Sequence, residues 1–92
     1  MGNQYVVVRT YSAGVHVGEL VDRRDKEVTL ANARRIWSWQ GANTLNEIAL
    51  RGVGKGSRVS EPVSRIILTE AIEILECTPE GEGALRKSSW AK

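Results

Sequence analysis

Short runs of β-branched and aromatic residues, separated by polar turns, occupy the first third of the chain and predict β-strands. The runs cover residues 5–11, 15–21 and 27–30, and the polar residues 22–26 form a hairpin tip between the last two. Gly18 interrupts the second run and predicts a bulge or a bend. Regular short strands with tight turns are typical of a strongly bent antiparallel sheet or an SH3-like barrel.

Residues 31–39 allow two interpretations, because their first half has fair helix propensity whereas the second half, Ile-Trp-Ser-Trp, prefers a strand. We favour a strand over about 34–39. In a helix the two tryptophans would point about 200° apart, whereas in a strand they share a face. Strand alternation defines two faces: Arg35, Trp37 and Trp39 on one, and Arg34, Ile36 and Ser38 on the other.

A short helix is predicted next. Thr44 and Glu47 have the spacing of a capping box, in which the hydroxyl and the carboxylate satisfy free backbone N–H groups of the first turn. The helix covers about 45–52 and ends at Gly52 or Gly54. The fold class is therefore α+β and mostly β, with one short helix.

Two further apolar runs, residues 66–68 and 71–75, predict one or two strands that return to the sheet. The sequence that follows, Thr-Pro-Glu-Gly-Glu-Gly over residues 78–83, is typical of a linker. We therefore expect a single small β-rich domain over residues 1–77 and a loosely ordered C-terminal tail over residues 78–92.

Composition indicates a soluble globular protein. The chain has 92 residues, of which 41% are hydrophobic and 26% charged, and no apolar run is long enough to span a bilayer. The first residues lack the basic and apolar regions of a signal peptide, and the single cysteine allows no internal disulfide. We expect a cytoplasmic protein with no membrane partner. Because its core is small, we also expect a homo-oligomer.

Positive charge is concentrated in the middle of the chain. The net charge is only +2, but residues 32–58 contain five basic residues and one acidic residue, Glu47. This concentration predicts a patch that attracts anions, with a solvated face that only maintains solubility as the alternative. A protein dedicated to duplex DNA would usually be more basic.

The chemistry-bearing residues argue against catalysis. His16 is the only histidine, and we expect it on a solvent-facing strand position, although it could contact a ligand. No nucleophile, paired-carboxylate or metal-binding motif is present, so we expect no enzyme activity, no cofactor and no metal. The glycine-rich loop around Lys55 has only a superficial likeness to a phosphate-binding loop, because a helix precedes it.

The candidate binding site combines arginines, tryptophans and the basic loop. Guanidinium groups and indole faces are the groups with which proteins hold planar, anionic molecules, so this combination predicts a nucleotide or nucleic-acid ligand. The alternative is that the tryptophans fill the core of a protein that lacks phenylalanine. The candidate ligand-binding residues are Arg34, Arg35, Trp37, Trp39, Lys55 and Arg58.

Two segments carry a resemblance to a known family: Tyr-Ser-Ala-Gly-Val-His-Val-Gly at 11–18, and Ala-Arg-Arg-Ile-Trp-Ser-Trp-Gln-Gly-Ala at 33–42. With them, residues 4–77 resemble a family of small proteins of unassigned function that tailed bacteriophages encode. The resemblance implies a viral origin and action in the bacterial host cytoplasm, and it supplies no catalytic residues. Phage accessory proteins of this size commonly inhibit host defence, some as oligomers that sequester nucleotide signals. That last step is an analogy from gene context.

Three functions follow as hypotheses. In the first, an oligomeric phage protein sequesters an anionic nucleotide signal and thereby counters host defence. In the second, the aromatic surface docks on a host defence protein and inhibits it. In the third, the sheet binds single-stranded nucleic acid by stacking its bases.

Overall fold

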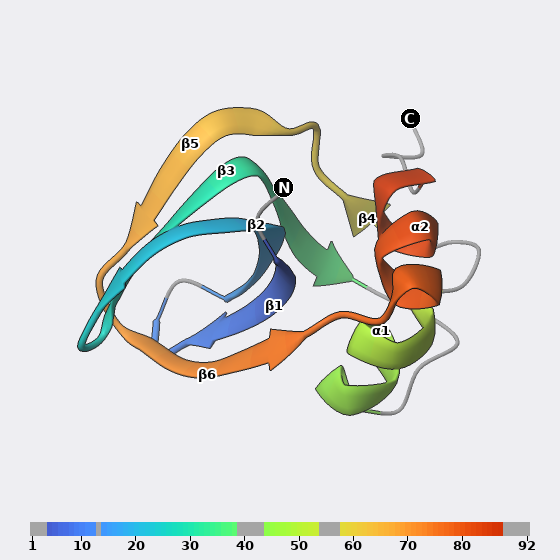
Figure 1. The fold of residues 1–92 in the computed structure, drawn as a ribbon, viewed down its shortest axis with the longest axis horizontal. Helices are drawn as coiled ribbons and strands as arrows, with labels where there is room; N and C mark the ends of the chain where they lie inside the picture. The colour runs from blue at the N-terminus through green and yellow to red at the C-terminus, as the bar shows by residue number, and fades with distance from the viewer. Residues whose placement is uncertain (1–3, 13, 39–43, 54–57, 88–92) are drawn as a thin grey trace.

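The computed structural model describes residues 4–12, 14–38, 44–53 and 58–87. These residues form six strands and two helices, which Figure 1 labels: β1 (Tyr5–Thr10), β2 (Val15–Arg24), β3 (Glu27–Ser38), α1 (Leu45–Arg51), β4 (Arg58–Val59), β5 (Val63–Leu68), β6 (Ala71–Glu76) and α2 (Pro79–Lys87).

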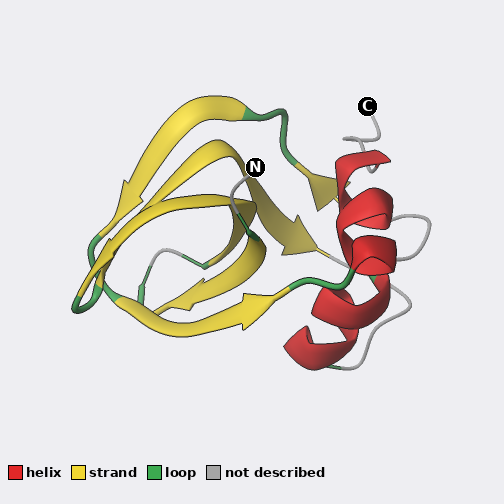
Figure 2. Ribbon diagram, viewed as in Figure 1, coloured by secondary structure: helices red, strands yellow, loops and turns green. Residues whose placement is uncertain are grey.

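The strands form one antiparallel sheet in the order β4-β3-β2-β1-β6, and β5 pairs with a further part of β3. The sheet curls strongly, and the two helices lie together on one side of it (Figure 2). The predicted class, a mostly β α+β fold with a strongly bent antiparallel sheet, is confirmed. The single predicted helix is joined by a second one, α2.

Two hydrophobic clusters fill the molecule, one on each face of the sheet. The inner cluster lies within the curl of the sheet and includes Val6 and Val8 of β1. The outer cluster lies between the sheet and the helices and includes Tyr5 and Val7 of β1 with Leu85 of α2. Because β1 is buried on both faces, its apolar run is continuous and does not alternate with polar residues.

A bulge at Gly18 changes which β3 side chains face each cluster. The pairing of β2 with β3 shifts between Val17 and Glu19, opposite Asn32, whose φ is 50°. A Cβ on Gly18 would lie 3.0 Å from the carbonyl oxygen of Ala31, so only glycine fits this approach without a shift. The predicted bulge is confirmed.

The β2–β3 hairpin is longer than the hydrophobic pattern predicts. Its turn consists of Asp25 and Lys26 alone, and Asp25 has a φ of 55°, which a two-residue hairpin turn requires. Residues 27–30 and the favoured strand from about 34 belong to one continuous strand, β3. The preference for strand over helix in this segment is confirmed through Ser38, and Trp39 lies outside the described residues.

The predicted first helix is confirmed, together with its N-terminal threonine cap and its end at Gly52. Thr44 has extended backbone angles, and its hydroxyl accepts a hydrogen bond from the backbone N–H of Glu47 at 3.3 Å. Gly52 ends the helix with a φ of 80°, and its N–H donates to the carbonyl of Ile48. Ile48 and Ala49 are buried toward the outer cluster.

The prediction of a loosely ordered tail from residue 78 is wrong for residues 79–87, which form α2. The hydroxyl of Thr78 caps this helix by accepting from the N–H of Gly81 at 3.0 Å, and it also donates to the carbonyl of Leu50 at 2.6 Å. Leu85 is fully buried in the outer cluster. Packing on α1 and on the sheet therefore stabilises a helix whose two glycines disfavour it locally.

Neither of the two described helices is long and apolar enough to cross a membrane.

Candidate functional site

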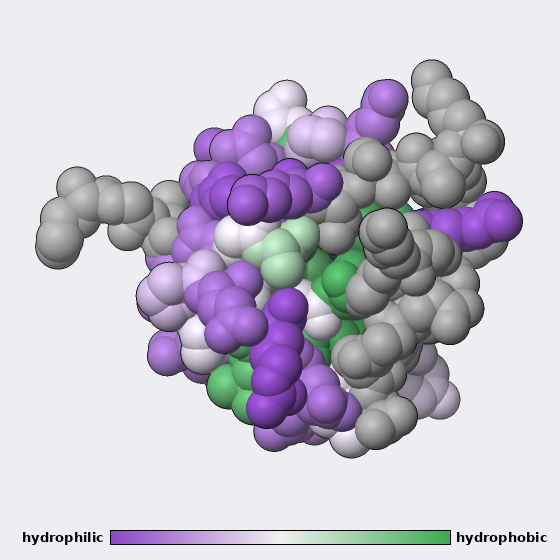
Figure 3. Space-filling view, turned by 90° about the vertical axis from the view of Figure 1, so that its right-hand side faces the viewer, coloured by the Kyte–Doolittle hydropathy of each residue, from purple (hydrophilic) through white to green (hydrophobic). Residues whose placement is uncertain are grey.

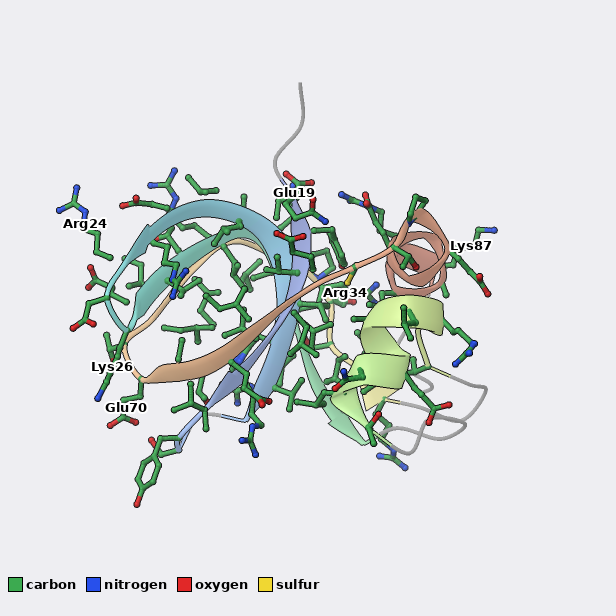
Figure 4. The ribbon with its side chains drawn as sticks, turned by 60° about the horizontal axis from the view of Figure 1, so that its bottom comes forward. Glu19, Arg24, Lys26, Arg34, Glu70 and Lys87 are labelled. Atoms are coloured by element: carbon green, nitrogen blue, oxygen red, sulfur yellow. The ribbon has the colours of Figure 1, made fainter. Side chains whose placement is uncertain are left out.

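Strand β3 directs its two adjacent arginines to opposite faces of the sheet, as alternation predicts. Arg34 faces the helices and is 8% exposed, whereas Arg35 is exposed on the inner side. Figure 4 shows Arg34 between the sheet and the helices. The two candidate ligand-binding arginines therefore have different surroundings.

The guanidinium of Arg34 holds three backbone carbonyls. Its Nε donates to the carbonyl of Ser60 at 2.8 Å, and its Nη1 donates to those of Leu85 at 2.8 Å and Arg86 at 3.3 Å. Leu85 and Arg86 lie in the last turn of α2, where carbonyl groups have no partner within the helix and the helix dipole is negative. Arg34 thus binds the C-terminal end of α2 to the sheet.

Arg35 contacts the only histidine of the chain. His16 and Arg35 are direct cross-strand partners in the β2–β3 pairing. The Nε of Arg35 donates a hydrogen bond to Nε2 of His16 at 3.2 Å, which places the imidazole proton on Nδ1. Ser60 fixes the backbone beside them, because its Oγ accepts from the N–H of Arg35 at 2.9 Å and its N–H donates to the carbonyl of Arg35.

A pocket of about 240 Å³ opens at this pair of side chains. Its polar groups come from β2, β3 and the residue after β4, and its apolar wall comes from β3 and β5. No acidic residue lines it within the described part of the chain. The lining residues are His16, Ala33, Arg34, Arg35, Ser60, Val63 and Ile66.

The prediction of a solvent-facing His16 is wrong, since this side chain is only 1% exposed. Strand β2 pairs on both sides, with β1 and β3, so His16 lies in the interior of the sheet and not at its edge. Nδ1 of His16 is buried and has no hydrogen-bond partner among the described residues. Burial, together with the positive charge of Arg35, lowers the pKa of His16 from 6.5 to about 4, so the imidazole is neutral at pH 7.

This low pKa predicts a loss of stability in mild acid. The unfolded chain binds a proton at His16 below about pH 6.5, whereas the folded chain resists protonation until about pH 4. The contribution of His16 to stability is therefore complete above pH 6.5 and is lost as the pH falls from 6.5 to 4. Between pH 7.5 and 5 this loss amounts to about 2 kcal/mol.

Urea unfolding of the wild-type protein and of His16→Gln at both pH values measures the effect. Glutamine keeps an acceptor for Arg35 but does not titrate, so the wild-type protein should lose about 2 kcal/mol more than the variant. Equal pH dependence of the two proteins would show that His16 does not have this pKa.

Of the four remaining candidate binding residues, the described structure includes Arg58 and the backbone of Trp37. Arg58 lies in β4 as the cross-strand partner of Ser38, next to the C-terminal end of β3, and it is exposed. Trp37 belongs to β3, but its side chain lies outside the described part of the structure. Trp39 and Lys55 lie wholly outside it. The structure thus brings β4 beside the strand that carries Arg35.

Sequence reasoning missed the apolar wall and the serine of the pocket. Ala33, Val63 and Ile66 come together because Ala33 pairs with Val63 and Leu30 with Ile66 across β3 and β5. Residues 60–63 precede the predicted strand, and no local pattern shows that they approach β3. Only the alternation of β3 could have indicated that Ala33 and Arg35 share a side.

Among the described residues, no group of three or more His, Cys, Asp or Glu side chains could hold a metal ion.

The fold and site define a class: a small curled-sheet protein with two helices on its outer face and a basic pocket on its inner side. Residues 3–85 match the family described as a domain of unknown function, DUF6948, and the chain belongs to this family. Comparisons with curated proteins and with solved structures give no match.

Proposed function

We propose that this chain is a non-catalytic binding protein whose Arg35 pocket holds an anionic nucleotide ligand. The observation that carries the proposal is the environment of Arg35: its guanidinium is oriented by a buried, neutral histidine, and no described residue that lines the pocket is acidic. A guanidinium held in this way is pre-organised for a bidentate contact with an oxyanion.

Hydrogen bonding at the pocket supports binding rather than catalysis. Nε2 of His16 accepts from Arg35, and Oγ of Ser60 donates to the carbonyl of Glu61 at 3.2 Å. The histidine and the serine therefore do not contact each other as a base and a nucleophile would. Their contacts orient Arg35.

We expect self-association, because the described core is small and three large apolar side chains, Val63, Ile67 and Ile72, are 49–56% exposed on β5 and β6. Trp37 follows Arg35 by two residues along β3, and we propose that an indole from this segment stacks on the base. Sequestration of a host defence signal rests on the resemblance to bacteriophage proteins.

Replacing Arg35 by glutamine should weaken nucleotide binding by at least about tenfold, because a charge-assisted bidentate contact is lost. Isothermal titration of the purified protein with cyclic mono-, di- and trinucleotides measures this change. Mass spectrometry of the denatured wild-type protein detects any ligand that copurifies.

Arg51→Gln is the matched control, because Arg51 is an exposed arginine on α1 that pairs with Glu47. It should bind within about twofold of the wild-type protein. Wild-type protein that carries no ligand and binds none of the panel would overturn the proposal, as would an Arg35→Gln variant that folds and binds normally.

A second candidate function is docking on a host protein. The exposed Val63 and Ile67 lie on β5, which among the described strands pairs only with β3, and an unpaired strand edge can accept a strand of another chain. Capture of one stoichiometric protein from bacterial lysate, lost in Ile67→Lys but kept in Arg35→Gln, would favour this function over nucleotide binding.

A further inference from the structure

Among the described lining residues, Arg35 is the arginine whose terminal guanidinium groups are open to a ligand. The Nε and Nη1 atoms of Arg34 donate to backbone carbonyls on the helix side of the sheet. His16 is neutral, because it is buried and accepts from Arg35. Arg35 uses only its Nε for a side-chain contact, and no hydrogen bond or ion pair within the described structure engages its two terminal Nη groups.

The hydrogen-bond donors that remain at the pocket therefore match a ligand group with one negative charge. Among the described lining residues, Arg34, Arg35 and His16 are the only ionisable ones, and none is acidic. A phosphodiester carries one negative charge, whereas a terminal phosphate carries about 1.5 to 2 at neutral pH. The excess charge of a terminal phosphate would enter an apolar-walled pocket in which Arg34, the other lining cation, already donates to backbone carbonyls.

Size restricts the ligand further. The pocket of about 240 Å³ is smaller than the range of about 300–1,000 Å³ that holds a complete drug-sized molecule. It can take one phosphate group with its neighbouring sugar or base. Ala33, Val63 and Ile66 then contact the uncharged part of that unit.

We propose that the Arg35 pocket recognises one phosphodiester unit and discriminates against terminal phosphates. This inference rests on the proposed function and specifies its ligand class: a nucleotide in which every phosphate is a diester. The terminal Nη groups of Arg35 donate to the two unesterified oxygens of the diester, and Nε remains on His16.

A pair of probes that differ in this one feature tests the inference. Cyclic AMP, a 3′,5′-phosphodiester, should bind at least about tenfold more tightly than 5′-AMP at pH 7.5. The difference should shrink to about threefold or less at pH 5.5, because protonation removes most of the second charge of 5′-AMP, whose second pKa is about 6. His16 remains neutral at that pH, since its pKa is about 4.

Each outcome has one meaning. Equal or tighter binding of 5′-AMP at pH 7.5 would overturn the phosphodiester inference and leave nucleotide binding intact. Binding of neither probe, nor of any cyclic di- or trinucleotide, would overturn both. Arg35→Gln should lose binding of cyclic AMP and the pH-dependent difference together, while Arg51→Gln should keep both.

A phosphodiester can belong to a small cyclic nucleotide or to a nucleic-acid strand, and a further comparison distinguishes these sources. Affinity that rises from a dinucleotide to a 12-residue oligothymidine and falls steeply with salt indicates a strand. Affinity that does not change with length indicates a small nucleotide. Either result supports phosphodiester recognition.

Discussion

Replacement of Arg34 by methionine should lower the free energy of unfolding by about 3–4 kcal/mol, the largest loss that we expect from any single side chain. Methionine fills part of the space but donates no hydrogen bond. The carbonyls of Ser60, Leu85 and Arg86 then lose a charged donor in a site that is almost closed to water. Small domains have only about 5–15 kcal/mol of stability in total, so this loss is a large fraction of it. Because Arg34 holds the end of α2, we expect α2 to detach at lower denaturant concentrations than in the wild-type protein.

Urea unfolding followed by circular dichroism measures this loss. Arg51→Met is the control, because it makes the same chemical change at an exposed arginine that pairs with Glu47 along one helix. It should change stability by about 0.5 kcal/mol or less. A loss below about 1 kcal/mol in Arg34→Met would mean that Arg34 does not attach α2 to the sheet.

Replacement of Gly81 by alanine should cost about 3 kcal/mol, because α2 crosses α1 at this residue with no space for a side chain. A Cβ on Gly81 would overlap the carbonyl oxygen of Ala49 and lie 2.8 Å from its carbonyl carbon. Backbone atoms on α1 cannot rotate away, so the two helices must separate. Their separation would also strain the contact of Thr78 with Leu50.

Gly83→Ala is the matched control in the same helix, since a Cβ at Gly83 meets nothing within 4 Å. It should stabilise the protein by about 0.5–1 kcal/mol, the usual gain from alanine over glycine in a helix interior. The two variants should therefore differ by about 4 kcal/mol in urea unfolding. Variants of equal stability would contradict the close helix crossing.

The sequence predicts most of the sheet, because its longer strands have strong local signals, but it does not predict the two-residue strand β4 or the first half of β5. Continuous or alternating apolar runs mark β1, β5 and β6, and the capping threonine and terminal glycine mark α1. The length of β3 is harder to predict, because Asn32 has a positive φ and shifts the alternation within the strand. Residues 28, 30 and 33 then all face the inner cluster, a pattern that no uniform period describes.

Helix α2 shows where composition misleads. Glycine at 81 and 83 favours a linker by propensity, yet Gly81 is required by the close approach of α1. Start and stop signals were present: Thr78 before Pro79 is a strong helix beginning, and Arg86 and Lys87 suit the last turn. Tertiary contacts stabilise this helix despite its two glycines. Its start and stop signals therefore indicate the structure better than its composition does.

For the candidate site, the sequence predicts which side of the sheet each of the two adjacent arginines faces, but not what either arginine contacts. Alternation separates Arg34 from Arg35 correctly, but it does not reveal that Arg34 binds the end of α2, 51 residues away. Burial of His16 also depends on the pairing of β2 with both neighbours. On the helix side of the molecule, hydrophilic residues lie beside hydrophobic ones near the centre of the view in Figure 3, an arrangement that the sequence pattern alone does not locate.

The most direct test of anion binding by the Arg35 pocket is an NMR titration of labelled protein with cyclic AMP. We expect the Nε–H signal of Arg35 and the amide signals of His16, Ala33 and Ser60 to shift together and to saturate at one ligand per chain. Absence of shifts, or shifts confined to α1 and α2, would contradict the account.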